Sequence, residues 1–444
     1  MKKIIALVLV IACTFTIFGC GAKEPAADPV APRPSADQPF ELMTVSVDDL
    51  SGDMMFDTRG VTKMSTSVFD ERLLEYIADN KEGNYMVSPV SFRYALGMLL
   101  AGAEGKTKDE LLAALGVTSV EEWEAYAAKL NGFRKFFADN LNREVSEIQE
   151  WKKQGWVDPA EPEPFRAVRI VNSIWKRDDI EEDFKQEFKD KITRNYGAEY
   201  YQFNRENVVG RVNAWSNEKT EGMIKELLPQ DYNADDLAIV LMNALYFKDS
   251  WETEFYESDT KDDEFTTIGG KKVTKAFMNA TYKMDYYADD ATQIVILPMN
   301  GGVNMAYVLG DTNNIADKIS KCQERKVILS IPKLDVETSF NNSEFKDFLK
   351  ANGVRHAFDK DMADFSAMID HPVYVDDIIQ KTHLKTDEKG VEAAAVTAIM
   401  VYDCAMFIEE PEPVEFKANK QFSFYIYATA DNATAMLFAG EIVE

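Results

Sequence analysis

The histidines and cysteines are the residues of this chain whose chemistry is easiest to recognise, because they serve as bases, nucleophiles and metal ligands. The 444-residue chain has three histidines, His356, His371 and His383, and none is paired with another at the spacing of a zinc-binding helix. Its four cysteines form neither a CxxC pair nor a zinc pattern. Nucleophile-elbow, dinucleotide-binding and P-loop motifs are absent from the sequence. The sequence therefore predicts no catalytic residue, no metal site and no cofactor, and we expect a protein that is not an enzyme.

Cys20 is a thiol whose surroundings indicate a covalent modification. Lys2 and Lys3 precede an apolar run over 4–18, which is short for a membrane span but suits a signal peptide. The run ends in the tetrapeptide IFGC, which resembles the lipobox of bacterial lipoproteins, where the cysteine is acylated and becomes the first residue of the mature chain. We predict a signal peptide over 1–19 and lipidation of Cys20. Ordinary cleavage with a soluble product is the alternative.

A tether follows the predicted anchor. Residues 23–40 are rich in Pro, Ala and Asp, so they favour an extended spacer and cannot bury a core. We predict a lipidated tether and linker over 20–62 and a folded domain over 63–444. The protein would then be exported and held at a bacterial membrane or cell surface, on its extracellular or periplasmic side.

The charge of the chain limits the kinds of molecule that it is expected to bind. Asp and Glu number 76 against 49 Lys and Arg, for a formal net charge of -27. A surface this acidic repels phosphates and no basic run offsets it, so nucleic acid is excluded as an expected partner. Hydrophobic residues make up 46% of the chain, which is enough for a large core.

The order of the predicted elements indicates an α+β fold. Apolar residues recur at helical spacing over 67–77, and 92–101 is typical of a buried helix. Thr107 begins a capping-box pattern, and Gly116 should end the helix that the pattern starts. Later in the chain, 293–309 and 422–439 have the pattern of antiparallel hairpins. The charged and then proline-rich stretch 140–165 should be a surface insertion.

Several sequence blocks, in order, resemble the serpin family over roughly 66–444. The resemblance implies an α+β serpin-like fold, with three β-sheets, eight to nine helices and an exposed reactive loop near the C-terminus. No block is specific by itself, but their order and spacing together are. The blocks are 84–91, 102–107, 213–215, 220–227, 241–248, 331–334, 345–358, 388–397 and 416–422.

The resemblance makes 388–397 the hinge segment of the reactive loop. In inhibitory serpins a target protease attacks this loop and forms an acyl-enzyme. The cut loop then inserts as a central strand of the largest sheet and drags the attached protease with it. The expected hinge segment consists of Glu388, Lys389, Gly390, Val391, Glu392, Ala393, Ala394, Ala395, Val396 and Thr397.

The residue types in this segment suit a strand with one buried face. Alternate residues of a strand point to opposite faces, and a buried unpaired charge would cost several kcal/mol. Counting from Val391, one face is small or β-branched, and every charge falls on the other. We predict that the first face turns inward and that Gly390 gives the backbone freedom to bend. The inward face comprises Val391, Ala393, Ala395 and Thr397, and the outward face Gly390, Glu392, Ala394 and Val396.

The resemblance also implies a polar region where the sheet opens. Ser88, Ser91 and Asn243 match the family's shutter positions, and Gln380 stands where the family often has a histidine. Because Gln also donates and accepts hydrogen bonds, we expect a working but altered network. Trp251 matches an aromatic at the top of the opening sheet, although ordinary core packing explains it equally well.

Family spacing places the cleaved bond between Cys404 and Ala405, with Tyr402 and Met406 as alternatives if the register slips. A small, apolar cysteine suits an elastase-like or a cysteine protease, and no basic residue for a trypsin-like pocket occurs in 398–408. Subtilisin-, chymotrypsin- and papain-like enzymes stay as further candidates. An exposed thiol would also make inhibition sensitive to oxidants.

Two functions follow from the resemblance. The first is a monomeric, extracytoplasmic inhibitor that traps serine-type, and possibly cysteine-type, proteases by cleavage and insertion of its reactive loop. The second is a non-inhibitory serpin-like binding or scaffold lipoprotein. The second is supported by Val391 and Val396, because bulk at these positions would slow insertion.

Overall fold

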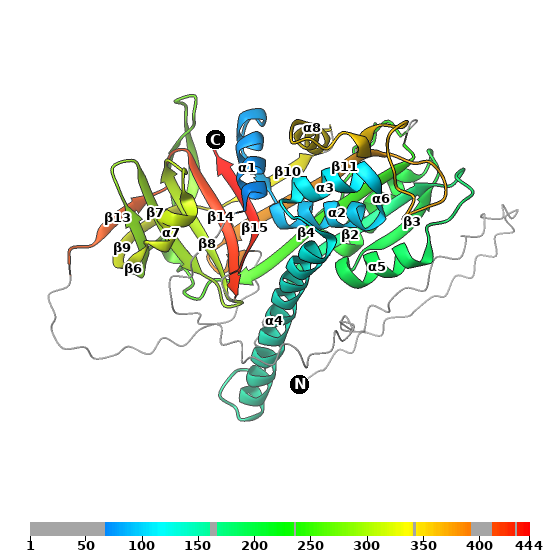
Figure 1. Cartoon of the computed structure of the whole chain (residues 1–444). Coiled ribbons are helices and arrows are strands. Elements are labelled where there is room, and N and C mark those ends of the chain that lie inside the picture. The colour runs from blue at the N-terminus through cyan, green and yellow to red at the C-terminus, as the bar shows by residue number, and fades with distance from the viewer. Residues whose placement is uncertain (1–66, 160–166, 235–236, 341–342, 392–410, 431–432) are drawn as a thin grey trace, which may run out of the picture. The chain divides into compact units, whose positions relative to one another are not determined.

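The computed structural model describes residues 67–159, 167–234, 237–340, 343–391, 411–430 and 433–444 (Figure 1). These residues belong to one compact unit. Within them the α-helices are α1 (Val68–Asn80), α2 (Pro89–Gly102), α3 (Gly105–Leu115), α4 (Val120–Lys153), α5 (Gln186–Tyr196), α6 (Val208–Lys219), α7 (Ile315–Ser320) and α8 (Glu344–Ala351). Two short 3-10 helices are η2 (Glu257–Asp259) and η3 (His356–Phe358).

The strands of the described residues fall into two hydrogen-bonded sheets. A six-stranded sheet has the order β10 (Asp335–Phe340), β11 (Val375–Asp387), β12 (Gly390–Val391), β4 (Ile239–Ser250), β2 (Ala167–Arg177) and β3 (Glu199–Phe203). A nine-stranded sheet has the order β1 (Tyr85–Val87), β15 (Ala433–Ile442), β14 (Phe422–Ala430), β8 (Val303–Gly310), β7 (Thr292–Pro298), β6 (Lys272–Ala288), β9 (Gln323–Pro332) and β13 (Val414–Lys417). The ninth strand, β5 (Lys261–Thr266), pairs with β6.

The α+β class predicted from the sequence is confirmed, whereas a count of three sheets is not. The reason lies in β6, which has 17 residues and pairs with β7 at one end and with β9 along most of its length. One long strand thereby joins two ladders into a single hydrogen-bonded sheet. The two predicted hairpins are present as β7–β8 and β14–β15.

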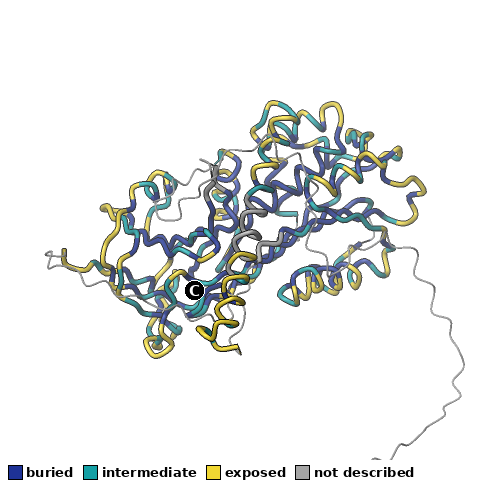
Figure 2. The backbone as a smooth tube through the Cα atoms, turned by 90° about the horizontal axis from the view of Figure 1, so that it is seen from below, coloured by how far each residue is buried: buried dark blue, intermediate teal, exposed yellow. Residues whose placement is uncertain are grey.

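The six-stranded sheet is covered by apolar packing on both faces. In β4, Leu241 and Leu245 point toward the large core that includes α2, while Met242 and Ala244 point toward a smaller core that includes α6. This alternation is the period of two that a strand imposes. Buried residues follow the strands of both sheets, and exposed ones gather on outer helix faces and loops (Figure 2). Because both faces are covered, β4 is apolar from Ile239 to Phe247 except for Asn243.

The helix ends are set by local residues, and one predicted end is wrong. Ser67 and Asp70 form a capping box at the start of α1. The capping box predicted at Thr107 is absent, because α3 already begins at Gly105 and the Thr107 hydroxyl instead accepts a hydrogen bond from the Asp364 N–H at 3.0 Å. Gly116 ends α3 with φ 73°, as predicted, since glycine adopts this left-handed conformation without strain.

The stretch 140–165 begins inside α4, which is 34 residues long and extends away from the sheets (Figure 1). Most described side chains in 142–159 are exposed, as the charge pattern predicts. None of the helices among the described residues is long and apolar enough to cross a membrane.

Candidate functional site

Strands β4 and β11 form the centre of the six-stranded sheet. Among the described residues they are the one pair of neighbouring strands that also has a third strand between them, over part of their length. They pair in parallel from Ile239 and Val375 at one end to Leu245 and Thr382. Beyond that point they separate, and β12 lies between them, antiparallel to both. The first residues of the predicted hinge segment thus occupy a place in the sheet.

Gly390 is required here because the backbones of β12 and β4 come very close together. A Cβ built on Gly390 would lie 2.2 Å from the carbonyl oxygen of Asp249, and its φ is 154°. Any other residue would therefore have to move β12 away from β4. The sequence predicted freedom to bend at this glycine, but here its role is to let two strands come together.

Val391 is 1% exposed and belongs to the large core. It pairs with Thr386 of β11 and Asp249 of β4. The inward orientation predicted for Val391 therefore agrees with the structure. The other predicted face residues, 392–397, lie outside the described residues.

The turn before β12 is held by Asp387 and Trp251. The Asp387 carboxylate accepts hydrogen bonds from the Lys389 N–H at 2.8 Å and the Gly390 N–H at 3.2 Å. Trp251 donates its indole N–H to the Asp387 carbonyl and its backbone N–H to the Lys389 carbonyl, both at 2.9 Å. Trp251 is 1% exposed, so it combines core packing with one contact to the hinge segment, at Lys389, and one to the preceding residue, Asp387.

Glu388 carries a buried charge that two neighbours satisfy. Its carboxylate accepts a hydrogen bond from the Thr260 hydroxyl at 2.6 Å and pairs with the Lys333 ammonium at 2.7 Å. Burial alone would raise the pKa of Glu388, but these two contacts outweigh it and leave the pKa below its usual value. The sequence named Glu388 but neither partner, because both come from distant parts of the chain.

The predicted shutter residues form one buried network in the middle of the strand pair. Gln380 lies opposite Asn243 in the β11–β4 register. Its amide accepts from the Ser88 N–H at 2.9 Å and donates to the Ser88 carbonyl at 3.2 Å and to the Asn243 side-chain oxygen at 3.1 Å. Asn243 also accepts a hydrogen bond from the Ser91 hydroxyl and donates to the Ser91 carbonyl at 3.1 Å. Gln380 thus both donates and accepts.

Asn172 completes this network and was missed from the sequence. Its side-chain oxygen accepts a hydrogen bond from the Asn243 amide at 2.5 Å, and it lies opposite Asn243 in the β2–β4 register. The available signal was a polar residue inside the apolar run 170–174. Ser88, Ser91, Asn172, Asn243 and Gln380 are each at most 1% exposed. The network therefore joins three strands and the start of α2 through direct hydrogen bonds between protein groups.

The opposite end of the strand pair, which we call the foot, consists of Ala238, Ile239, Asp376 and Asp377. A bulge in β11 leaves Asp376 outside the regular register. The Asp376 carboxylate instead accepts hydrogen bonds across the gap from the Ala238 N–H at 2.6 Å and the Ile239 N–H at 3.2 Å. A side chain here replaces the backbone acceptor that the bulge removes.

Both foot carboxylates are hard to ionise. Burial raises the pKa of Asp376, and the backbone N–H groups of Ala238 and Ile239 only partly offset this. Burial likewise raises the pKa of Asp377 to about 6, although the Ile378 N–H donates to its carboxylate at 2.8 Å. Lys346 of α8 lies nearby, but its ammonium donates to the Asp376 backbone carbonyl at 2.9 Å.

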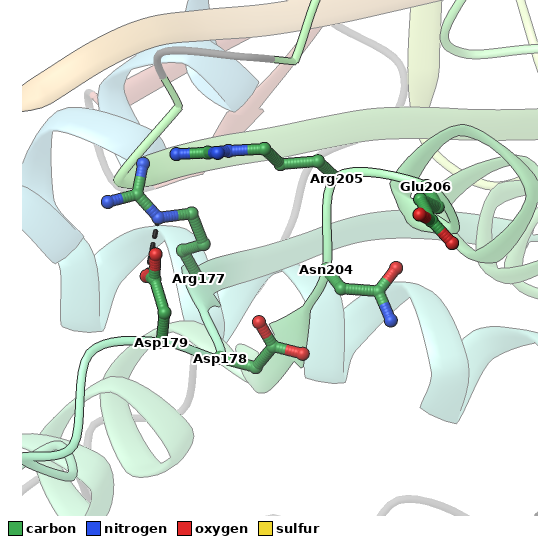
Figure 3. A pocket seen from close by; sticks show the side chains of 6 residues that line it. All are labelled: Arg177, Asp178, Asp179, Asn204, Arg205 and Glu206. Atoms are coloured by element: carbon green, nitrogen blue, oxygen red, sulfur yellow. Dashed lines mark hydrogen bonds and ion pairs between the residues drawn. The ribbon is translucent and has the colours of Figure 1, made fainter.

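A polar hollow of about 340 Å³ lies beside the foot, at the end of β2 (Figure 3). Arg177 turns its guanidinium toward Asp179, with 2.5 Å between the Arg177 Nε and an Asp179 carboxylate oxygen, and Arg205 runs alongside it (Figure 3). Arg177 also donates to the Leu237 carbonyl at 3.0 Å. Three carboxylates line the same hollow, so it offers no net positive site for an anion. It is lined by Arg177, Asp178, Asp179, Asn204, Arg205 and Glu206.

The three histidines and Cys322 each lie in surroundings that stabilise the fold and form no reactive site among the described residues. His356, His371 and His383 each contact one carboxylate, at 2.6, 3.0 and 2.8 Å respectively. Cys322 is buried, and burial raises the pKa of its thiol to about 12, so it is unreactive near neutral pH. Among the described residues no group of His, Cys, Asp and Glu side chains is placed to hold a metal ion. Cys20, Cys404 and Ala405 lie outside the described residues.

The family model "Serpin (serine protease inhibitor)" matches residues 64–444. The chain belongs to the serpin family. A serpin-ZX of Hordeum vulgare is 30% identical over 393 residues, covering 82% of this chain and 91% of the relative. Serpin B6 of Bos taurus is 27% identical over 400 residues, covering 85% and 97%. Serpins are generally protease inhibitors and not catalysts.

Solved serpin structures share the fold. The crystal structure of Serpin48 from the insect Tenebrio molitor covers 85% of this chain and 96% of its own, with a TM-score of 0.66 and 24% identity. Human thyroxine-binding globulin, in complex with its hormone, covers 84% and 95%, with a TM-score of 0.65 and 19% identity. At these identities the likeness establishes the serpin fold, and this fold serves both inhibitors and a hormone carrier.

Proposed function

We propose that this serpin is a trapping inhibitor of proteases, in which the cleaved reactive loop inserts between β4 and β11. The observation that carries the proposal is the position of β12. Its two residues already lie between these strands, with the orientation that a longer inserted strand would need. Once the inserting strand reached Leu245 and Thr382, each further residue would replace part of the parallel β4–β11 pairing with two antiparallel pairings, which are more stable per residue.

The register of β12 supports an inward face that the core can accept. Val391 pairs with Asp249 and Thr386, so each later loop residue would face one residue earlier in each strand. Six residues on, Thr397 would lie between Asn243 and Gln380. Its hydroxyl would thus meet the buried polar network, where partners for a hydroxyl are present. A large apolar or charged residue would fit this position poorly.

The same register supports the outward face. One residue after Val391, Glu392 would lie between Lys248 of β4 and Lys385 of β11. Lys385 is exposed, and Lys248 is half-buried. The charge of the inserting strand would therefore be neutralised by two cations on the strands it separates, which favours insertion over repulsion.

The non-inhibitory alternative rested partly on the bulk of Val391. Because Val391 is already buried in the resting state, its side chain presents no further obstacle to insertion. Val396 lies outside the described residues, so a binding or scaffold role stays as the alternative to test.

The remaining parts of the proposal come from the sequence. Cleavage after Cys404 suits an elastase-, subtilisin-, chymotrypsin- or papain-like protease in preference to a trypsin-like one. Lipidation of Cys20 would hold the inhibitor on the outer side of a bacterial membrane. We propose that it acts there as a monomer and forms no complex with nucleic acid.

Incubation of the mature protein with these four classes of protease, followed by denaturing gels, tests the function. We expect a covalent complex near the summed mass of the two proteins. Cleavage without a complex, and without a gain in thermal stability, would contradict it.

A matched variant separates insertion from simple recognition of the loop. Exchanging Glu392 and Ala393 leaves the composition unchanged but moves the carboxylate to the inward face, opposite Phe247 and Leu384 by the register. The exchanged variant should be cut at the same bond yet form no complex. The single substitution Glu392→Ala is the control and should still trap the protease.

A further inference from the structure

At the foot, the Asp376 side chain adds two hydrogen bonds to the backbone pairing of β4 with β11, which there joins Ile239 to Val375. Elsewhere the two strands are joined by backbone pairing, by the Asn243–Gln380 contact or by β12. At the foot, the Asp376 carboxylate receives both the Ala238 and the Ile239 N–H groups across the gap. A strand that followed the register of β12 would come opposite Ile239 after ten residues, so full insertion reaches this contact.

We propose that Asp376 is a positioning residue that acts as a latch at the foot, holding β4 against β11 until the last step of insertion. This inference rests on the proposed trapping function. Neighbouring strands lie about 4.8 Å apart, so a strand placed between β4 and β11 would separate them to about 9.6 Å. A carboxylate cannot span that distance, and both of its hydrogen bonds must break.

The two sides of the latch are anchored to different parts of the molecule. On the β4 side, Ala238 is held to β2, because the Arg177 N–H donates to its carbonyl at 3.0 Å. On the β11 side, the Lys346 ammonium of α8 donates to the Asp376 carbonyl at 2.9 Å. Each strand end is therefore fixed to its own neighbour, and the Asp376 carboxylate is the polar side-chain link between them. When the strands separate, this link must break together with the backbone pairing of Val375 with Ile239.

The latch works against insertion and in favour of the resting state. Two backbone hydrogen bonds are lost together when the foot opens, and an N–H group that loses its partner in a partly buried place costs free energy. The need to break these hydrogen bonds slows the final step, in which an attached protease would be pulled to the end of the sheet. A slow final step gives the acyl-enzyme time to hydrolyse, so the latch sets the fraction of encounters that end in trapping.

The test compares the full mature protein with Asp376→Ala and Asp376→Asn. The reactive loop is cleaved, and the rate at which the protein gains resistance to heat is measured, together with the ratio of complex to cleaved inhibitor. Asp376→Ala should insert about tenfold faster. Asp376→Asn keeps one oxygen that can accept both hydrogen bonds, because a single oxygen accepts both in the parent, so its insertion rate should lie closer to that of the parent. The uncleaved Asp376→Ala protein should melt at a lower temperature, while the fully inserted form should melt unchanged.

Asp289→Ala is the matched control. The Asp289 carboxylate also accepts two backbone hydrogen bonds, from Ala291 at 2.9 Å and Thr292 at 2.8 Å, but within one turn and away from the gap. This variant should insert at the parental rate. Equal insertion rates in Asp376→Ala and the parent, or equal losses of stability before and after insertion, would overturn the latch.

Failure of the latch is distinguishable from failure of the proposed function. If the parent forms no complex and gains no stability after cleavage, trapping is wrong for the natural chain. The latch then predicts that Asp376→Ala alone gains stability on cleavage. If neither protein gains stability, the latch is also overturned.

Discussion

At the hinge end of the β4–β11 pair, meaning 387–391 with their partners Trp251, Thr260 and Lys333, a third strand already separates the two. At the foot, the two strands pair directly and the Asp376 side chain adds a second link. Both ends bury carboxylates beside backbone N–H groups, yet only Glu388 at the hinge end has a cation at its carboxylate. The pKa of Glu388 is consequently lowered, and the pKa values of Asp376 and Asp377 are raised.

This difference teaches that burial alone does not decide whether a carboxylate stabilises a fold. Where a cation neutralises the charge, the ionised form is favoured and adds stability at neutral pH. Where hydrogen bonds and a more distant cation only partly offset the loss of water, desolvation prevails and the ionised form costs stability. The two ends of one strand pair should therefore respond to acid in opposite directions.

The largest expected effect is at the hinge end. Trp251→Ala removes a fully buried indole and its contact to Asp387, so we expect a loss of about 3–5 kcal/mol in the free energy of unfolding. Amide exchange should accelerate at 387–391 and stay unchanged at the Ala238 and Ile239 amides of the foot. Trp251→Phe, which keeps the packing, is the control and should cost clearly less. Equal acceleration at both ends would show that the ends are not independent.

The Glu388–Lys333 pair should show the second-largest effect. Lys333→Ala leaves the Glu388 charge buried without its cation, and we expect a loss of about 2 kcal/mol at pH 7, because Lys333 is partly exposed. Since the folded pKa is lowered, this stability is present above about pH 4.5 and is lost as the pH falls through the folded pKa. Urea unfolding of Lys333→Ala, Glu388→Gln and the double variant at pH 7 and pH 4 measures it. A coupling between the two residues that persisted undiminished at pH 4 would refute the assignment.

Asp377→Asn tests the foot, and its sign should be opposite. Because the folded pKa of Asp377 is raised to about 6, the folded state binds a proton that the unfolded chain has already released. The contribution of this site is therefore greatest below about pH 3.8 and falls as the pH rises through about 6. Asp377→Asn should gain about 1 kcal/mol at pH 7 and flatten the stability profile between pH 4 and 6. A loss at pH 7 with an unchanged profile would mean that the hydrogen bonds to the carboxylate outweigh its charge.

The smallest effect at neutral pH is expected midway between the ends. Gln380→His keeps one donor and one acceptor while the imidazole is neutral, so we expect a change below about 0.5 kcal/mol at pH 7.5. Below about pH 6.5 the imidazolium loses its acceptor for the Ser88 N–H, and stability should fall. Thermal melts across pH 5–8 compare it with Gln380→Leu, which should be destabilised at every pH. A flat profile for the histidine variant would place Ser88 outside the network.

The family, the α+β class and the location of the hinge segment could be predicted from the sequence, since these depend on local spacing and on the order of short blocks. It also indicated which side of Val391 faces the core, because the period of a strand is local. It did not reveal the capping of α3, because a tertiary contact with Asp364 takes the hydroxyl of Thr107.

What only the tertiary structure decided is which distant groups meet. Lys333 and Thr260 neutralise and cap Glu388, Asn172 completes the network around Asn243, and Asp376 closes the foot, each from a different segment of the chain. Asn172 stands out as a polar residue in its strand, but the pattern does not say which side chain it meets. No local pattern marks Lys333, Thr260 or Asp376, because an aspartate in an acidic chain looks the same whether it faces water or a neighbouring strand. The backbone groups it binds, and the water it loses, are fixed only when the strands come together.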